Sequence, residues 1–300
     1  VEILAIHDIE EERAKSNAGK YSIPAYFLSV EKLLEQQLDM VYIASPVFLH
    51  KEHILMAIKA GKHVLCEKPL TRTLDESYAI KETLKKTNIK LQVGFMMRYH
   101  GAHQKVKEML TNGAIGKPII ARAQLSHYKV EYTPDGKPSW RTKKDLSGGG
   151  SLMDMGIHCI DLLRFWFGEA ELISSRAETI DNDYDVEDTA VGLLRFPSGP
   201  IATIDSSFAV NGAQQIFEIY GTKGTLFGEG TIDQLPGGSL TYSDREGKKQ
   251  VNFEKINMYA AEIRALIQAI IEDKEPEINI DENIKNQKII SEIYKNNNFG

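Results

Sequence analysis

Short apolar stretches alternate with longer segments of helical spacing over the first hundred residues. We interpret the apolar stretches as strands, and the segments between them, where apolar side chains recur every three or four positions, as helices. Short strands separated by helices indicate βαβ units and therefore a parallel sheet. The predicted strands cover 1–6, 39–45, 63–66 and 91–95, and the predicted helices cover 10–20, 28–38, 50–60 and 73–86.

The pattern changes after about residue 98, where strands begin to follow one another through short turns. Short connections favour antiparallel pairing, so an antiparallel sheet with helices on one side is predicted. The predicted strands cover 119–128, 172–180, 189–196, 201–208, 215–220 and 225–227, and the predicted helices cover 103–112, 152–167, 258–272 and 283–295. We therefore divide the chain into two domains, 1–97 and 98–300, in line with a prior of about 150 residues per domain.

The amino-acid composition excludes some classes of binding partner. The net charge of −6 over 300 residues argues against a nucleic-acid binder, because phosphate contacts require a surplus of lysine and arginine. No apolar run approaches the roughly 20 residues of a membrane-spanning helix, so no membrane partner is expected. Two cysteines, Cys66 and Cys159, are too few for a disulfide framework and favour a cytoplasmic location. We expect the partner to be a small molecule.

Ligands of parallel α/β sheets bind at the carboxyl ends of the strands. In this sequence those ends carry Asp8, Ser45-Pro46, Glu67-Lys68 and the segment 95–98. An acid at the position of Asp8 can accept both hydroxyls of an adenosine ribose and repels a 2′-phosphate, which favours NAD over NADP. The alternative is that Asp8 is a solvated loop residue or a helix cap.

Lys68 lies at the end of an apolar strand, between Glu67 and Pro69. A lysine held there would point into the crevice between the domains, where partial desolvation makes its ammonium group a strong electrostatic element. The alternative is an ordinary surface lysine.

The apolar helix that follows three glycines at 148–150 contains two polar interruptions, Asp154 and His158. Glycines leave free N–H groups and permit close backbone approach at a helix start. The spacing i, i+4 places both side chains on one face, and a histidine beside a carboxylate is suited to acid–base chemistry near neutral pH. The alternative is a structural Asp–His hydrogen bond. No cluster of cysteine and histidine has metal-ligand spacing, so no metal site is predicted.

Other candidates rest on position alone. Trp140 and Arg141 stand in the polar loop before the glycines and are candidates to cover a cofactor, while His50, Arg98 and Tyr99 are candidates for the cleft. The loop 131–137 is a candidate for the substrate pocket. The sequence lacks G-x-S-x-G, Walker A and H-E-x-x-H motifs, so hydrolase, kinase and metalloprotease functions receive no support.

Together these segments resemble the Gfo/Idh/MocA oxidoreductase family, which contains glucose–fructose oxidoreductase and inositol dehydrogenases. The resemblance extends over essentially the whole chain. It rests most specifically on Glu67-Lys68-Pro69 combined with the glycine, aspartate and histidine pattern of 148–158. Further matching segments are 44–46 with His50, 60–64, 94–99, 140–141, 186–189 and 221–224.

The resemblance implies a Rossmann domain followed by an α+β domain with an open, mostly antiparallel sheet that binds substrate and forms a homodimer or homotetramer interface. It implies that the family's catalytic lysine corresponds to Lys68, with Asp154 and His158 as its partners. The Lys68–Pro69 peptide bond is expected to be cis. The residues implied to contact the cofactor are Asp8, Ser45, Pro46, His50, Glu67, Lys68, Trp140 and Arg141; Arg98 joins this set by its position.

Some features depart from the family pattern. The sequence starts at what would be the second Rossmann strand, without the first strand and the glycine-rich pyrophosphate loop. We therefore expect that the natural protein is longer and that the chain as given binds NAD poorly. Val47 and Met96 also stand where the family often has asparagine.

The expected reaction is a reversible hydride transfer between NAD and a hydroxyl-bearing carbon of a sugar, cyclitol or related polyol. His158 is expected to act as general base or acid, Lys68 to stabilise charge on the same oxygen, and Asp154 to orient the substrate or His158. Which of Lys68 and His158 takes the proton is left open. The alternatives are a glycosidase that uses bound NAD and a non-catalytic NAD- or sugar-sensing regulator.

Overall fold

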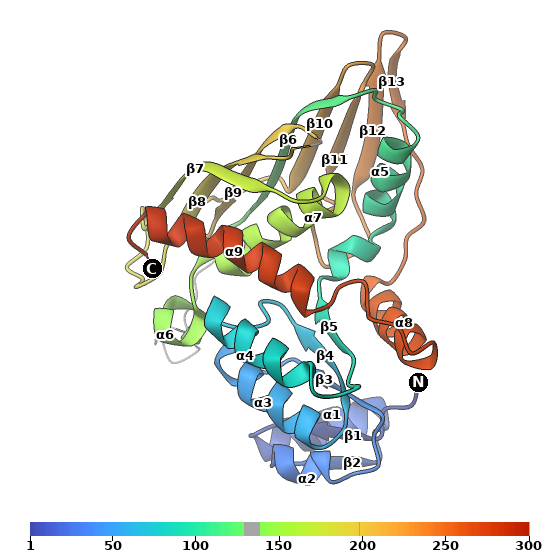
Figure 1. Cartoon of the computed structure of the whole chain (residues 1–300), viewed down its shortest axis with the longest axis vertical. Coiled ribbons are helices and arrows are strands. Elements are labelled where there is room, and N and C mark those ends of the chain that lie inside the picture. The colour runs from blue at the N-terminus through green and yellow to red at the C-terminus, as the bar shows by residue number, and fades with distance from the viewer. Residues whose placement is uncertain (129–138, 198, 300) are drawn as a thin grey trace.

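The computed structural model describes residues 1–128, 139–197 and 199–299 (Figure 1). We call residues 1–95 the N-terminal part and the remainder the C-terminal part. In the N-terminal part, strands β1 (Ala5–His7), β2 (Ala25–Phe27), β3 (Met40–Ile43), β4 (His63–Glu67) and β5 (Leu91–Gly94) alternate with helices α1 (Glu11–Tyr21), α2 (Val30–Leu34), α3 (Val47–Lys59) and α4 (Leu74–Leu84). All pairings here are parallel, which confirms the prediction, but they form two sheets, β1-β2 and β3-β4-β5, rather than one.

Local sequence signals set several of these boundaries. The hydroxyl of Thr73 accepts a hydrogen bond from the backbone N–H of Glu76 at 3.3 Å and so caps the start of α4. Gly61 follows α3 with a φ of +72°, a conformation that favours glycine. Strand β2 was not predicted, since it has only three residues within a polar stretch.

The C-terminal part is built on one eight-stranded sheet with the order β13-β12-β11-β10-β6-β9-β8-β7. Its pairings are antiparallel except for β6 with β9, where Ile120 lies opposite Ile201. The strands are β6 (Pro118–Ser126), β7 (Glu171–Glu178), β8 (Thr189–Arg195), β9 (Ile201–Ser207), β10 (Ile216–Gly221), β11 (Thr225–Glu229), β12 (Ser239–Asp244) and β13 (Gly247–Gln250). The helical segments are η1 (Met96–Tyr99), α5 (Gly101–Thr111), η2 (Trp140–Thr142), α6 (Lys144–Ser147), η3 (Leu152–Gly156), α7 (Ile157–Phe167), α8 (Met258–Ile271) and α9 (Ile280–Asn296).

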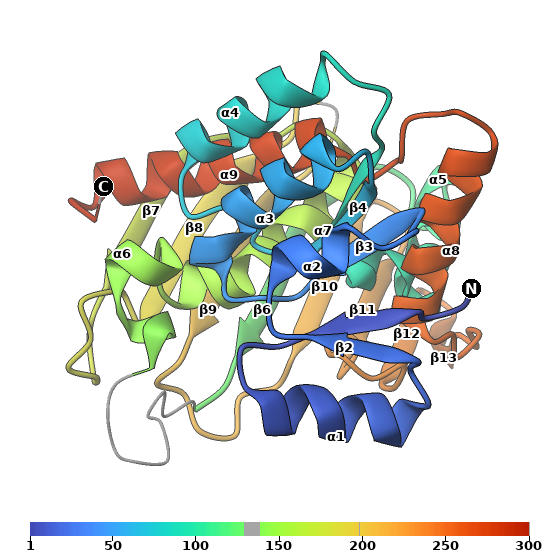
Figure 2. The same ribbon diagram turned by 90° about the horizontal axis from the view of Figure 1, so that it is seen from below.

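Helices α7 and α9 cover one face of this sheet, as predicted (Figures 1 and 2). Strands β12 and β13 were not predicted. No helix in the described ranges is both long and apolar enough to cross a membrane.

The two parts meet through helices that belong to the C-terminal part in sequence. Helix α8 packs against β4, β5 and η1, and α9 packs against α4. Gln287 on α9 donates from its amide to the Thr71 carbonyl at 2.8 Å and accepts from the Ser77 hydroxyl at 2.6 Å. The predicted domain boundary at 97/98 stays a prediction. Helix α8, which that boundary assigns to the second domain, packs against strands of the N-terminal part.

A buried ion cluster lies beside this junction. The Arg98 guanidinium donates to both carboxylate oxygens of Asp161, at 2.9 and 2.7 Å, and to Glu282 at 3.0 Å. The side chains of Arg98 and Asp161 are only 5% and 1% exposed. Asn286 also donates to Asp161, at 2.8 Å. Every member of the cluster has a partner, which is the condition for burying charge at tolerable cost.

We predict that Arg98→Ala lowers the free energy of unfolding by about 3–5 kcal/mol, because Asp161 would remain buried without its cation. Urea unfolding followed by circular dichroism measures the change. The matched control is Arg176→Ala, which removes a pair between exposed side chains and should cost less than about 1 kcal/mol. Equal losses in the two variants would contradict the assignment of Arg98 to the cluster.

Candidate active site

Lys68 and Asp154, which are 86 residues apart, meet where the two parts of the chain face each other. Strand β4 ends at Glu67, and the Lys68–Pro69 peptide bond that follows is cis. The Lys68 Nζ atom lies 3.0 Å from Asp154 Oδ1 and donates to the Asp154 backbone carbonyl at 2.6 Å. Both side chains keep partial exposure, at 15% and 28%. The pair is thus fixed by two contacts and still open to a ligand.

The helix carrying Asp154 and His158 has the predicted extent but a different start. Its first turn, Leu152–Gly156, is π-helical, and α7 continues from Ile157. Such turns occur frequently at functional sites. The structure therefore places Asp154 within the π-helical turn and His158 near the start of α7.

His158 lies beside this pair in a nearly closed environment. Its side chain is 4% exposed, and its ring meets the ring of Phe95 edge-on at a centroid distance of 6.4 Å. Within the described ranges its Nδ1 atom has no hydrogen-bond partner. Burial, with the nearby charge of Lys68, lowers the pKa of His158 well below its ordinary value. The imidazole is therefore neutral at physiological pH.

A narrow cleft opens at Asp154 and contains both predicted loop residues. Trp140 meets Phe48 edge-on at 6.2 Å, and the Arg141 guanidinium lies 4.5 Å from the centre of the Trp140 ring. The cleft is lined by Val47, Pro69, Trp140, Arg141, Ser147, Gly149, Gly150, Met153, Asp154 and Phe208. It therefore combines an aromatic surface, a cation and the Asp154 carboxylate that holds Lys68.

Three further predicted residues lie at the strand ends. The backbone N–H of Lys68 donates to Glu67 at 3.2 Å, and the Tyr42 hydroxyl donates to the other Glu67 oxygen. The Ser45 hydroxyl lies 3.0 Å from Nδ1 of His53. Pro46 immediately precedes α3. These residues occupy the edge where the sequence placed them, although whether they touch a cofactor stays a prediction.

Asp8 follows β1 and is paired with Arg13. The Arg13 Nε and Nη2 atoms donate to its two carboxylate oxygens at 2.5 and 2.9 Å, and the backbone N–H of Glu10 donates at 2.9 Å. The Arg13 hydrogen bond holds the pKa of Asp8 below its ordinary value. Asp8 is therefore anionic at neutral pH, as its predicted role requires.

The structure gives His50 a setting different from the one we expected. His50 is buried, with Nε2 at 2.7 Å from the Ser45 carbonyl and Nδ1 at 3.0 Å from the Pro69 carbonyl. It ties the end of β3 to the turn after Lys68, and both ring nitrogens are engaged there. Direct contact between His50 and a cofactor stays a prediction.

Arg98 also departs from its expected setting. Its guanidinium is bound within the buried cluster with Asp161 and Glu282 rather than at a strand end facing the cleft. A strand end fixes where the backbone emerges, but the direction of the side chain depends on partners distant in sequence. The expected loop 131–137 lies outside the described residues.

Two buried acids are not among the residues predicted from the sequence. Glu187, just before β8, binds the start of the helix that carries Asp154; its only sequence signal is its place in the segment 186–189. Glu262 on α8 is fully buried, and within the described ranges neither carboxyl oxygen has a hydrogen-bond partner. Burial and the nearby charge of Glu67 raise the pKa of Glu262 to about 8, so this residue is mainly a neutral carboxylic acid at pH 7.

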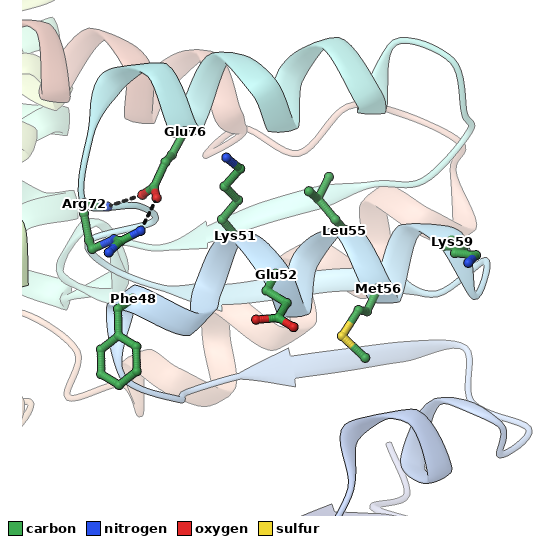
Figure 3. A pocket seen from close by; sticks show the side chains of 8 residues that line it. All are labelled: Phe48, Lys51, Glu52, Leu55, Met56, Lys59, Arg72 and Glu76. Atoms are coloured by element: carbon green, nitrogen blue, oxygen red, sulfur yellow. Dashed lines mark hydrogen bonds and ion pairs between the residues drawn. The ribbon is translucent and has the colours of Figure 1, made fainter. Parts of the chain in front are cut away.

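A second depression lies on the outer side of α3 and α4 and is separate from this site. Figure 3 shows its lining, with the Arg72–Glu76 ion pair at one end. The lining residues are Phe48, Lys51, Glu52, Leu55, Met56, Lys59, Arg72 and Glu76. None of the predicted catalytic residues belongs to it.

The residues present fit a dinucleotide cofactor better than a metal. No group of three or more metal-ligating side chains occurs among the residues with described positions. The strand ends carry Asp8, Ser45 and Glu67, and the cleft supplies the Trp140 ring and the Arg141 cation, which suit a ribose, a planar ring and a phosphate.

Comparison with known proteins agrees with this geometry. A family model described as "Oxidoreductase family, NAD-binding Rossmann fold" matches residues 1–95, and one described as "GFO/IDH/MocA C-terminal domain" matches residues 103–227. A 1,5-anhydro-D-fructose reductase of Ensifer adhaerens is 32% identical over 90% of this chain and 80% of its own length. A myo-inositol 2-dehydrogenase of Thermotoga maritima is 32% identical over 82% of this chain and 72% of its own. The crystal structure of an aldose-aldose oxidoreductase from Caulobacter crescentus superposes with a TM-score of 0.88 and 26% identity, covering 97% of this chain and 87% of that one.

We predict that His158 shows no imidazole titration near neutral pH, because its burial and the Lys68 charge lower its pKa and favour the neutral ring. NMR of ring-labelled histidine measures this, with the resonance assigned through its loss in His158→Asn. A midpoint near about 6.5, the value of an unperturbed histidine, would contradict the prediction.

Proposed function

The chain belongs to the Gfo/Idh/MocA family of NAD-binding oxidoreductases, and on this basis we propose that it transfers a hydride between NAD and a hydroxyl-bearing carbon of a sugar or cyclitol. The observation that carries the proposal is the Lys68 ammonium group, held by Asp154 beside the neutral ring of His158. Relatives named as acting on an anhydro sugar, an inositol and an aldose support this substrate class.

The cofactor supplies the hydride acceptor or donor when it is bound. Oxidation of an alcohol also requires its hydroxyl proton to leave. In our proposal the Lys68 Nζ donates a hydrogen bond to that oxygen as negative charge develops there. Asp154 holds the Lys68 amine in place through the ion pair at 3.0 Å. We propose that the neutral imidazole of His158, rather than Lys68, receives the proton.

The proposed cofactor preference is NAD, with NADP second. Asp8 supports it, because an anionic side chain after β1 accepts hydroxyl hydrogen bonds and repels a 2′-phosphate. Arg13 offsets part of this charge through its pair with Asp8. The preference for NAD over NADP therefore depends on whether the carboxylate oxygens of Asp8 stay bound to Arg13 or accept hydrogen bonds from a ribose.

We further propose that the large sheet forms a homodimer. On the sheet face opposite α7 and α9, Ile120, Ile201 and Tyr220 lie on adjacent strands in register and are 56%, 51% and 43% exposed. An apolar patch of neighbouring side chains is typical of a protein interface.

Cys66 and Cys159 are buried free thiols, in keeping with the cytoplasmic location proposed from the sequence.

We predict that the protein is a dimer by size-exclusion chromatography with light scattering and that Ile120→Asp/Ile201→Asp is monomeric, because two buried charges would oppose association. Ile271→Asp is the matched control, since Ile271 is 73% exposed on α8, away from the sheet. A monomeric wild-type protein, or a double variant that stays dimeric, would contradict the interface.

The activity is tested by initial rates with NAD and NADP against a panel of sugars and inositols. We predict that Lys68→Met lowers kcat/KM on the best substrate by about 100-fold or more, because the developing charge loses its donor. His158→Asn should also reduce turnover. Lys51→Met, in the outer depression, is the matched control and should keep the wild-type rate. Wild-type kcat/KM in both Lys68→Met and His158→Asn would contradict the proposed function.

A further inference from the structure

Other groups of the protein occupy the space beside the glycines that precede the active-site helix. A Cβ atom on Gly149 would lie 2.0 Å from the Tyr294 hydroxyl oxygen, and one on Gly150 would lie 1.8 Å from the Glu187 carbonyl oxygen. Neither distance is sterically allowed. Because these positions lack side chains, Glu187 and Tyr294 can approach the backbone at the start of the helix closely.

Glu187 uses this access to bind the helix start directly. One carboxylate oxygen accepts the N–H of Gly150 at 2.9 Å, and the other accepts the N–H of Leu152 at 2.8 Å and the hydroxyl of Tyr294 at 2.9 Å. Its backbone carbonyl accepts the N–H of Ser151 at 3.1 Å. Glu187 is fully buried, and no lysine, arginine or histidine in the described ranges pairs with it. Helix-start N–H groups and one phenol are thus its stabilising partners.

Hydrogen bonds through Asp154 connect the helix start that Glu187 binds to the amine of Lys68. The N–H of Asp154 donates to the Gly150 carbonyl at 3.0 Å, so Asp154 lies one turn beyond the residues that Glu187 holds. The Asp154 carbonyl and carboxylate in turn hold Lys68. A displacement of the helix start would therefore move both oxygens that position the amine.

We propose that Glu187, supported by Tyr294, is a positioning residue that sets the helix start and thereby places Asp154 and the Lys68 amine for hydride transfer. The inference rests on the proposed function for the roles of Lys68 and Asp154. Glu187 itself touches neither cleft nor substrate in this arrangement; it acts through the backbone of 150–154.

The ionisation of Glu187 gives this role a measurable signature. Burial raises its pKa to about 7, against the lowering effect of the Leu152 and Gly150 N–H groups. The groups that face it are Tyr294 from α9 and the helix-start N–H groups. The neighbouring Asp188 carboxylate is instead turned to the N–H groups of 180–182. As the pH falls through about 7, Glu187 gains a proton and loses accepting capacity at the helix start.

The experiment compares Glu187→Gln with wild type over the pH range 5 to 9. We expect wild-type kcat to fall on the acid side with a midpoint near 7, whereas Glu187→Gln has a rate about 10-fold lower at pH 8 and lacks this limb. KM for the cofactor should stay within about twofold, since positioning acts on the transition state. Hydrogen exchange of the peptide covering 149–156 should become faster in the variant.

Asp188→Asn is the matched control, because Asp188 is equally buried but does not touch the helix start. It should lower the melting temperature while keeping the wild-type kcat and acid limb. If Glu187→Gln does not fold, Tyr294→Phe removes one of the three side-chain bonds, and the limb should move to higher pH as Glu187 loses a donor.

The proposal is overturned if Glu187→Gln, or Tyr294→Phe in its place, keeps wild-type kcat, pH profile and hydrogen exchange. It is also overturned if Asp188→Asn reproduces the change in kcat and acid limb. Failure of the proposed function has a different signature, namely wild-type kcat/KM in both Lys68→Met and His158→Asn, and the hydrogen-exchange comparison does not depend on turnover.

Discussion

The contact between Lys68 and Asp154 is the interaction on which the rest of the site depends. It joins a strand end of the N-terminal part to a helix of the C-terminal part through contacts of 2.6 and 3.0 Å, which exist only in this relative placement of the two parts. The proposed role of Lys68 therefore requires a fixed junction between the two parts. Buried polar contacts supply it, among them the ion cluster around Arg98 and the hydrogen bonds of Gln287. Such contacts specify one relative placement because their groups are costly to leave unpaired.

The sequence was informative where function depends on local pattern. Strand ends placed Lys68 at the carboxyl edge of the parallel sheet, and helical spacing placed Asp154 and His158 on one face of a helix. Only the family resemblance implied that the three residues lie together. The sequence was uninformative where side-chain direction depends on distant partners, as for Arg98, whose partner Asp161 is 63 residues away. Strand β13 was missed because all four of its residues are exposed and polar, so no alternation marks it. The π-helical turn at Asp154 carries no signal that periodicity can detect.

The glycines at 148–150 illustrate how one pattern supports two physical explanations. Free N–H groups and the absence of Cβ atoms suit a bound phosphate, and they suit an internal carboxylate equally well. The structure shows the second arrangement, since the Glu187 carboxylate accepts the N–H groups of Gly150 and Leu152. A glycine run before a helix therefore indicates an anion near the backbone without saying whether that anion belongs to a ligand or to the protein.

Helix α8 has a consequence for how this architecture can be recombined. Although it follows the last strand of the large sheet in sequence, it packs against β4 and β5, and its Glu262 carbonyl accepts the Gln92 amide at 2.8 Å. A chimaera that joined this N-terminal part to a relative's C-terminal part at residue 97 would replace α8 with a foreign helix against the same strands. Exchange of substrate domains between relatives therefore needs three crossover points, one near 97, one before 258 and one between α8 and α9, so that α8 stays with the strands it covers and α9 stays with the large sheet.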